Sequence, residues 1–336
     1  MSKKLRWGIL STAWINVALV PVIQLSRRSE LVALASRDLK KSQIYAQEHG
    51  IPIAYGNYES LIDDDQIDVI YNPLPNALHC EWTVKAAQSG KHVLCEKPMA
   101  LSLAELRAVE DASRENNVWI VEAYAYMHHP QLQRIIELIE SNDLGDIYQF
   151  TGWDTFPLPD SDSNYRFDVT MGGGSLWDIG VYPVSLAIVL NRSECPIDVW
   201  ALQTKGETGV DLAFFGQMRF ASGLVAHISS SFRSPERRGA RIVGSKGILR
   251  VADHLSGQEV PGEPPGEGVL ALTTTNGYET TIIIPAVDAY QREVEAMERL
   301  VMDGTNTAVP LSLSRDILRT IDALHRSASS GERVHL

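Results

Sequence analysis

The feature that most constrains the fold is an alternation of short apolar runs with helix-like segments through roughly the first 125 residues. Apolar runs occur at 5–10, 31–35, 67–71, 92–95 and 118–121, and segments with helical spacing lie between them, at 15–25, 39–49, 77–89 and 102–116. This alternation predicts parallel strands joined by helices. We therefore expect a doubly wound parallel α/β sheet, with ligands beyond the carboxyl ends of its strands.

The pattern changes after about residue 126. A helix is expected at 132–139, a long apolar helix at 175–190 and two closing helices at 289–302 and 314–328. Strand signals occupy 147–156, 199–203, 212–220, 224–232, 240–243, 248–251, 270–274 and 279–284. This predicts two domains, 1–124 and 125–336, the second an α+β domain with a large, mostly antiparallel open sheet. An open apolar sheet face tends to be covered by a partner. We therefore expect a homo-oligomer, a dimer or tetramer, formed through the C-terminal sheet.

Composition excludes several classes of protein. The 336 residues carry a formal net charge of −12 and lack a basic run, which argues against nucleic acid or an anionic membrane as partner. No stretch approaches the roughly 20 apolar residues of a membrane span, and the N-terminus has no signal-peptide core. Cys80, Cys95 and Cys195 form no disulfide framework and no C-x-x-C zinc pair. We expect a cytoplasmic, metal-free protein with a small-molecule partner.

The turn after the first strand resembles a dinucleotide-binding turn. A G-x-G-x-x-G fingerprint would place glycines at Ser11, Ala13 and Asn16, two of which are still small residues. The segment Ser11-Thr12-Ala13-Trp14-Ile15 is therefore predicted to let the backbone approach a pyrophosphate at a helix N-terminus, as in Rossmann domains. An ordinary strand-to-helix turn is the alternative.

The end of the second strand indicates which dinucleotide binds. NAD-binding domains usually place a carboxylate there for the ribose 2′-hydroxyl. This chain has Ser36 and Arg37, whose hydroxyl and guanidinium suit a 2′-phosphate. Asp38 follows directly, and a solvated arginine is the alternative reading of Arg37. The pattern favours NADP, with NAD still possible.

Two further strand ends carry candidate site residues. Pro73, Leu74, Asn76 and His79 follow the third apolar run, where a rigid turn could support a ribose. Glu96-Lys97-Pro98 follows the fourth. Lys97 could hydrogen-bond a reacting hydroxyl or depress the pKa of a neighbouring acid, with Glu96 as its tether. A plain rigid turn and a surface Lys-Pro pair are the alternatives.

A last cluster lies on the predicted apolar helix. Asp178 and Tyr182 are four residues apart, so a regular helix would place them on one face, and Arg166 precedes them in a polar loop. Tyr182 could give and take a proton if Lys97 lowered its pKa, with Asp178 and Arg166 binding substrate hydroxyls. The alternative is a core tyrosine whose hydroxyl is satisfied by Asp178.

Taken together, Glu96-Lys97-Pro98, Pro73-Leu74-Pro75-Asn76 and the segment Gly172-Gly173-Gly174-x-Leu-x-Asp-x-Gly-x-Tyr182 resemble the glucose–fructose oxidoreductase / inositol dehydrogenase / rhizopine catabolism family. The resemblance spans nearly the whole chain. Tyr182, where many members carry histidine, is similar to the branch with glucose–fructose oxidoreductase, NADP-linked D-xylose dehydrogenase and dimeric dihydrodiol dehydrogenase. Asn16 departs from the small residue usual in the first turn.

This resemblance implies an NADP-dependent oxidoreductase that moves a hydride to or from a sugar or related polyhydroxylated substrate. It implies Lys97 and Tyr182 as the catalytic pair. A nucleotide-sugar ketoreductase and a cyclic-diol dehydrogenase are the enzymatic alternatives. A non-catalytic dinucleotide-binding regulator is the alternative from another class.

Overall fold

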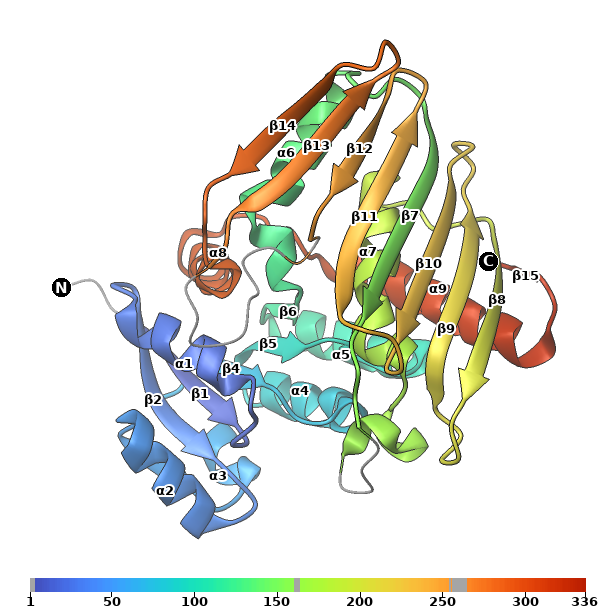
Figure 1. Cartoon of the computed structure of the whole chain (residues 1–336). Coiled ribbons are helices and arrows are strands. Elements are labelled where there is room, and N and C mark those ends of the chain that lie inside the picture. Colours follow the sequence, from blue (N-terminus) through green and yellow to red (C-terminus); the bar gives the residue numbers. More distant parts are fainter. Residues whose placement is uncertain (1–3, 160–163, 254, 256–264) are drawn as a thin grey trace. The chain divides into compact units, whose positions relative to one another are not determined.

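A computed structural model describes residues 4–159, 164–253, 255 and 265–336 (Figure 1). Contacts divide these residues into two compact units. The first unit includes 4–128 and also 288–311, a segment that comes late in the sequence. The second includes the described parts of 129–259 and 265–287, and 312–336.

The first unit contains a six-stranded sheet with the strand order β3-β2-β1-β4-β5-β6. All of its neighbouring strands pair in parallel. The order reverses between β1 and β4, as in a Rossmann fold. The strands are β1 (Leu5–Leu10), β2 (Ser29–Ala35), β3 (Ile53–Tyr55), β4 (Val69–Asn72), β5 (His92–Glu96) and β6 (Ile120–Ala123). The predicted doubly wound parallel sheet is confirmed.

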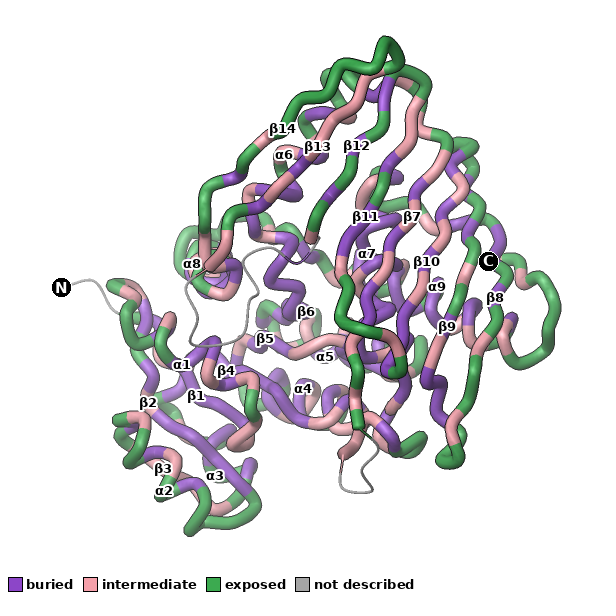
Figure 2. Tube along the Cα trace, viewed as in Figure 1, coloured by how far each residue is buried: buried purple, intermediate pink, exposed green. Residues whose placement is uncertain are grey.

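Burial explains why most of these strands could be recognised in the sequence. All four residues of β4 are buried, as are all residues of β1 but Arg6 and the three central residues of β5 (Figure 2), which is typical of a parallel sheet covered on both faces. The connecting helices are α1 (Asn16–Leu25), α2 (Leu39–His49), α3 (Tyr58–Ile62), α4 (His79–Gln88) and α5 (Leu103–Asn116). The sequence did not predict β3 and α3, because three half-buried residues and five helical ones are too short for a periodic signal.

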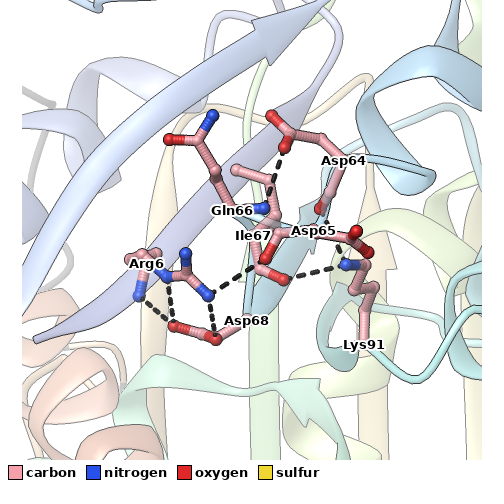
Figure 3. A network of polar contacts seen from close by, with 7 residues as sticks. All are labelled: Arg6, Asp64, Asp65, Gln66, Ile67, Asp68 and Lys91. Atoms are coloured by element: carbon pink, nitrogen blue, oxygen red, sulfur yellow. Dashed lines mark hydrogen bonds and ion pairs between the residues drawn. The ribbon is translucent and has the colours of Figure 1, made fainter. Parts of the chain in front are cut away.

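A polar network fixes the amino ends of three strands (Figure 3). The Arg6 Nε and Nη2 atoms donate to the two carboxylate oxygens of Asp68, at 2.9 and 2.8 Å. Lys91 Nζ donates to the carbonyl oxygens of Asp64 and Ile67, at 2.7 and 3.0 Å. These contacts join the starts of β1, β4 and β5. They lie at the amino ends of the strands, opposite the predicted site residues, so we infer that they hold the strands in register.

The second unit contains a nine-stranded sheet with the order β14-β13-β12-β11-β7-β10-β9-β8-β15. Its neighbours pair antiparallel except for β7 and β10. This confirms the predicted mostly antiparallel sheet. The strands are β7 (Ile147–Thr155), β8 (Asp198–Lys205), β9 (Asp211–Arg219), β10 (Val225–Ser231), β11 (Arg237–Gly244), β12 (Gly247–Val251), β13 (Gly268–Thr274), β14 (Glu279–Ile284) and β15 (Val334–His335).

Helices α6 (Pro130–Glu140), α7 (Val181–Leu190) and α9 (Leu311–Ser330) lie on one face of this sheet (Figure 1). Phe214 of β9, for example, packs edge-on against His325 of α9, with ring centroids 5.7 Å apart. Alternate residues of β9 therefore point away from the helices. Helix α8 (Ala289–Asp303) belongs to the first unit.

One segment corrects the sequence analysis. Val169–Leu190 spans 22 residues with a mean hydropathy of 1.4, and among the described residues it alone is long and apolar enough to cross a membrane. The expectation that no stretch approaches this composition was wrong. Most of the segment, 78% of its most apolar window, is buried inside the structure, as the central helix of a folded core would be.

Candidate active site

The turn after β1 has the backbone shape that a dinucleotide turn requires. Ser11 has a φ of 78°, in the left-handed region where glycine is usual. The fully buried Asn16 side chain donates from Nδ2 to the Ser11 carbonyl oxygen at 2.9 Å, and Ser11 Oγ accepts from the Ala13 amide at 3.2 Å. Side-chain contacts thus hold a turn that glycines would otherwise permit. Asn16 begins α1, and Trp14 is exposed beside it.

At the end of β2, the structure separates the roles of two neighbouring charged residues. Asp38 is the N-cap of α2, and its Oδ1 atom accepts from the amides of Lys40 and Lys41 at 2.9 and 3.2 Å. Its carboxylate is therefore engaged by the helix. Arg37 is exposed and Ser36 is 9% exposed. Both side chains are exposed, but the Asp38 carboxylate already caps α2, whereas Arg37 places a cationic group at this strand end.

The segment after β4 is fixed by its own buried polar groups. Asn72 Nδ2 donates to the His79 carbonyl oxygen and to Thr83 Oγ1, both at 3.1 Å. The ring nitrogens of His79 lie 2.7 Å from the Pro98 carbonyl oxygen and 2.6 Å from that of Leu74. Burial lowers the pKa of His79 to about 4, so the neutral ring donates to one of these two oxygens.

His79 therefore connects the Pro73–Asn76 segment to the Lys97–Pro98 turn. Both of its nitrogens face protein oxygens. Its predicted contact with the cofactor stays a prediction, while its contacts here give it a supporting role. Leu74 and Asn76 are each 5% exposed, and Pro73 is also buried.

Glu96 is held from β4 and approached from α8. The Tyr71 hydroxyl donates to Glu96 Oε1 at 2.7 Å. Glu293 of α8 is 1% exposed, and burial, aided by the nearby Glu96 carboxylate, raises its pKa well above the usual value. Lys97 itself is half-buried. Neither Tyr71 nor Glu293 could be recognised from sequence, because Tyr71 looks like an ordinary strand residue and Glu293 lies far along the chain.

In the second unit, Arg166 and Asp178 form an ion pair, with Arg166 Nε 2.7 Å from Asp178 Oδ2. The Asp178 side chain is 7% exposed and that of Arg166 is 32% exposed. The Asp178 charge raises the pKa of Arg166 against the effect of burial, and Tyr165 and Tyr182 contribute in the same direction. The predicted substrate residues therefore lie close enough to Tyr182 to interact electrostatically.

The helix that carries Asp178 and Tyr182 is not regular. Leu176–Gly180 forms a π-helical turn, and α7 begins only at Val181. The predicted regular helix from residue 175 was therefore wrong over its first turn. Pro183 has no amide hydrogen to donate one turn back, which interrupts regular α-helical bonding there. Asp178 lies in the π turn and Tyr182 in the first turn of α7, so their spacing does not follow from α-helical geometry alone.

The predicted site residues thus form two groups. Ser11–Ile15, Ser36–Arg37, Pro73–His79 and Glu96–Lys97 follow the carboxyl ends of β1, β2, β4 and β5, which belong to one sheet in the first unit. Arg166, Asp178 and Tyr182 belong to the second unit. Within residues 4–159, 164–253, 255 and 265–336, no three His, Cys, Asp or Glu side chains are placed to hold a metal ion.

Family models match both parts of the chain. Residues 5–124 match the oxidoreductase family with an NAD-binding Rossmann fold, and residues 132–250 match the GFO/IDH/MocA C-terminal domain. The chain belongs to the Gfo/Idh/MocA oxidoreductase family. Its resemblance to that family, inferred from sequence motifs, is confirmed, as is a Rossmann domain for a nicotinamide dinucleotide.

Members of the family with known names resemble the whole chain. D-xylose 1-dehydrogenase (NADP(+)) 2 of Haloferax volcanii is 38% identical over 98% of this chain and 99% of its own. A dTDP-3,4-didehydro-2,6-dideoxy-α-D-glucose 3-reductase of Saccharopolyspora spinosa is 30% identical over 92% and 91%. The structure of aldose-aldose oxidoreductase from Caulobacter crescentus, complexed with glycerol, has a TM-score of 0.88 at 25% identity and covers 99% of this chain and 100% of its own.

Proposed function

We propose that this protein is an NADP-dependent oxidoreductase that moves a hydride between the cofactor and a hydroxyl-bearing carbon of an aldose or related polyhydroxylated substrate. The observations that carry the proposal are two groups of polar residues, one in each unit. One follows the strand ends of a Rossmann sheet and contains Lys97. The other contains Asp178 and Tyr182, polar residues of an otherwise apolar helical segment, and Arg166, which pairs with Asp178 from an earlier turn. The similarity to the D-xylose dehydrogenase supports the same substrate class.

The residues at the strand ends fit a nicotinamide dinucleotide. Ser11, with its left-handed backbone conformation, lies just before the N-terminus of α1. Backbone amides at that terminus would bind the pyrophosphate. Ser36 and Arg37 would hold the 2′-phosphate of NADP, because Asp38 already caps α2. The bound cofactor would supply or accept the hydride at its nicotinamide ring.

Replacing Arg37 with alanine is expected to weaken NADPH binding by on the order of tenfold or more, since a charge-assisted hydrogen bond contributes about 1.5–3 kcal/mol. NADH has no 2′-phosphate, so its affinity should change little. The measurement is a fluorescence titration of the variant with each nucleotide. Lys40→Ala removes an exposed positive charge from α2 nearby and serves as the matched control. An equal loss in both variants, or for both nucleotides, would contradict a specific contact.

The protein residues divide the remaining work. Tyr182 would exchange the proton of the reacting hydroxyl, and Lys97 would orient that oxygen and stabilise negative charge on it. Asp178 and Arg166, already paired with one another, would bind the neighbouring hydroxyls. Residues 1–124 would form the nucleotide domain and 125–336 the substrate domain, with α8 returning to the first unit.

The test of the proposed function is turnover. The protein with NADP⁺ and a panel of aldoses should produce NADPH, measured by nicotinamide absorbance. A nucleotide-linked keto-sugar with NADPH and a cyclic diol with NADP⁺ complete the panel, since the similarity to the 3-reductase favours the first as second candidate. Nucleotide binding without turnover of any of these would favour a regulatory protein.

The outer face of the second unit supports a proposed homo-oligomer, a dimer or tetramer. Leu202 of β8 and Phe215 of β9 are cross-strand partners, 50% and 53% exposed, and Trp200 beside them is 42% exposed. Phe214 and Gly216, on either side of Phe215, face α9, so Phe215 and its cross-strand partner Leu202 point away from that helix. Contiguous exposed apolar side chains of this kind mark an interface.

The double variant Leu202→Glu/Phe215→Glu is expected to be a folded monomer, because two buried unpaired carboxylates cannot be accommodated in an apolar interface. Light scattering coupled to gel filtration gives the mass of each species. Tyr278→Glu, at the exposed turn between β13 and β14, is the control and should keep the parent mass. A monomeric parent protein would refute the proposed oligomer.

A cytoplasmic location is part of the same proposal. Its support is that Cys80, Cys95 and Cys195 are all free thiols.

A further inference from the structure

The most informative buried group outside the predicted site is Asp211, the first residue of β9. It is 3% exposed, and its Oδ2 atom accepts from Ser175 Oγ at 2.7 Å and from the Leu176 amide at 2.8 Å. Ser175 Oγ also contacts Ser230 Oγ of β10 at 2.9 Å. Asp211 therefore binds the two residues at which the helical segment carrying Asp178 and Tyr182 begins.

The two glycines before this segment, Gly173 and Gly174, allow the backbone to pack closely against Asp211 and Arg166. Gly174 has a φ of 118°, and a Cβ atom built on it would lie 2.2 Å from Asp211 Oδ1. A Cβ atom on Gly173 would lie 2.6 Å from the Arg166 carbonyl oxygen. That oxygen accepts from the Gly174 amide at 3.0 Å, while the Arg166 side chain pairs with Asp178. Gly174 therefore lies against Asp211 and donates to the backbone of Arg166, whose side chain pairs with Asp178.

Burial and hydrogen bonding act in opposite directions on the Asp211 carboxylate. Burial raises the pKa of Asp211 to about 6, against the hydrogen bonds from Ser175 and Leu176, which favour the carboxylate. A buried carboxylate stabilises a fold poorly unless its hydrogen bonds fix a particular arrangement. Negative charge at the amino end of a helical segment also interacts favourably with the helix dipole. Both effects act on the backbone immediately before Asp178.

We propose that Asp211 is a positioning residue for the reaction: its carboxylate fixes the amino end of the π turn, and thereby the places of Asp178 and Tyr182. It does not touch substrate or cofactor in this role. The inference rests on the proposed function for its effect on turnover, and on the structure alone for its effect on the π turn.

The experiment compares Asp211→Ala with Asp211→Asn and with Asp198→Ala. Asp198, on β8 of the same sheet, is also buried, at 5% exposed, and accepts hydrogen bonds from Arg219 and Arg333 rather than from residues of the π turn. Asp211→Ala should lower kcat by on the order of 10- to 100-fold, the effect of a small misplacement of reacting groups, with the Kd for NADPH unchanged. Asp211→Asn should recover most of kcat, because its amide oxygen can accept the same two hydrogen bonds. Asp198→Ala should reduce thermal stability without this loss of kcat.

Hydrogen exchange supplies a measurement that needs no turnover. Amides of residues 176–182 should exchange faster in Asp211→Ala than in the parent or in Asp198→Ala. Unchanged exchange in these amides would overturn the inference, whether or not the parent acts on a sugar. Faster exchange with full kcat would also overturn it. If the parent turns over no substrate but exchange is faster in Asp211→Ala, the proposed function would be refuted, while the role of Asp211 in fixing the π turn would be supported.

Discussion

Lys97→Met is expected to lower kcat by about 10²- to 10⁴-fold while the Kd for NADPH changes by less than a few-fold. Methionine keeps the length and most of the apolar stem of lysine but removes its charge and its hydrogen-bond donors. Proton transfer assisted by a placed side chain typically contributes a rate factor of about this size. Because Lys97 follows β5 beside Glu96, which Tyr71 holds, the backbone of the turn should survive the substitution.

The measurement is single-turnover kinetics with saturating NADP⁺ and the best sugar of the panel, together with a binding titration. Lys85→Met is the matched control, since Lys85 lies half-buried on α4, in an ion pair with Glu81 and over the Trp82 ring. It should leave both quantities unchanged. Full turnover in Lys97→Met would remove Lys97 from the reaction.

Tyr182→Phe is expected to lower kcat by at least about 10²-fold, with a small change in KM. The substitution removes a single oxygen atom from a half-buried ring at the start of α7, so the fold should be unaffected. If Tyr182 exchanges the proton, the pH dependence of kcat in the parent should be largely absent from the residual activity of the variant.

Tyr148→Phe makes the same chemical change on β7, where the ring is 55% exposed, and should behave like the parent. A Tyr182→Phe variant that keeps the parent kcat and pH profile would support the alternative reading of Tyr182 as a core tyrosine. The double variant Lys97→Met/Tyr182→Phe should be little worse than either single one if the two residues act as a unit.

The regulatory alternative differs from the catalytic one in the turnover that it predicts for the parent protein. A protein that only binds a dinucleotide would show the same nucleotide affinity in the parent and in both variants, and no turnover in any of them. Turnover of the substrate panel by the parent therefore separates the two classes of function, and the substitutions then test the roles of Lys97 and Tyr182.

Most of the framework could be predicted because it depends on local pattern. The apolar runs of β1 and β4 and the capping serine of α5, whose Oγ accepts from the Glu105 amide, are visible within a few residues of sequence. Positions at strand ends followed from the fold class, since carboxyl ends of parallel strands share one edge. The positions of Lys97 and Arg37 at strand ends could be predicted in this way, and their roles remain predictions.

What could not be predicted depends on contacts between distant residues. Asp211 looks like an ordinary strand residue until the structure brings it to Ser175, and Glu293 shows its burial only when α8 joins the first unit. The π turn required knowledge of how Pro183 changes bonding one turn earlier. Composition likewise could not distinguish the buried segment Val169–Leu190 from a membrane span.

NADP binding by the Rossmann domain is tested most directly by titrating the purified protein with NADPH and with NADH, following nicotinamide fluorescence. We predict saturable binding of NADPH, and clearly weaker binding of NADH, because Arg37 is exposed and the Asp38 carboxylate caps α2. Tighter NADH binding would contradict the assignment of Ser36 and Arg37. Binding of neither nucleotide would mean that the Ser11–Asn16 turn does not hold a pyrophosphate, and the proposed oxidoreductase activity would be wrong.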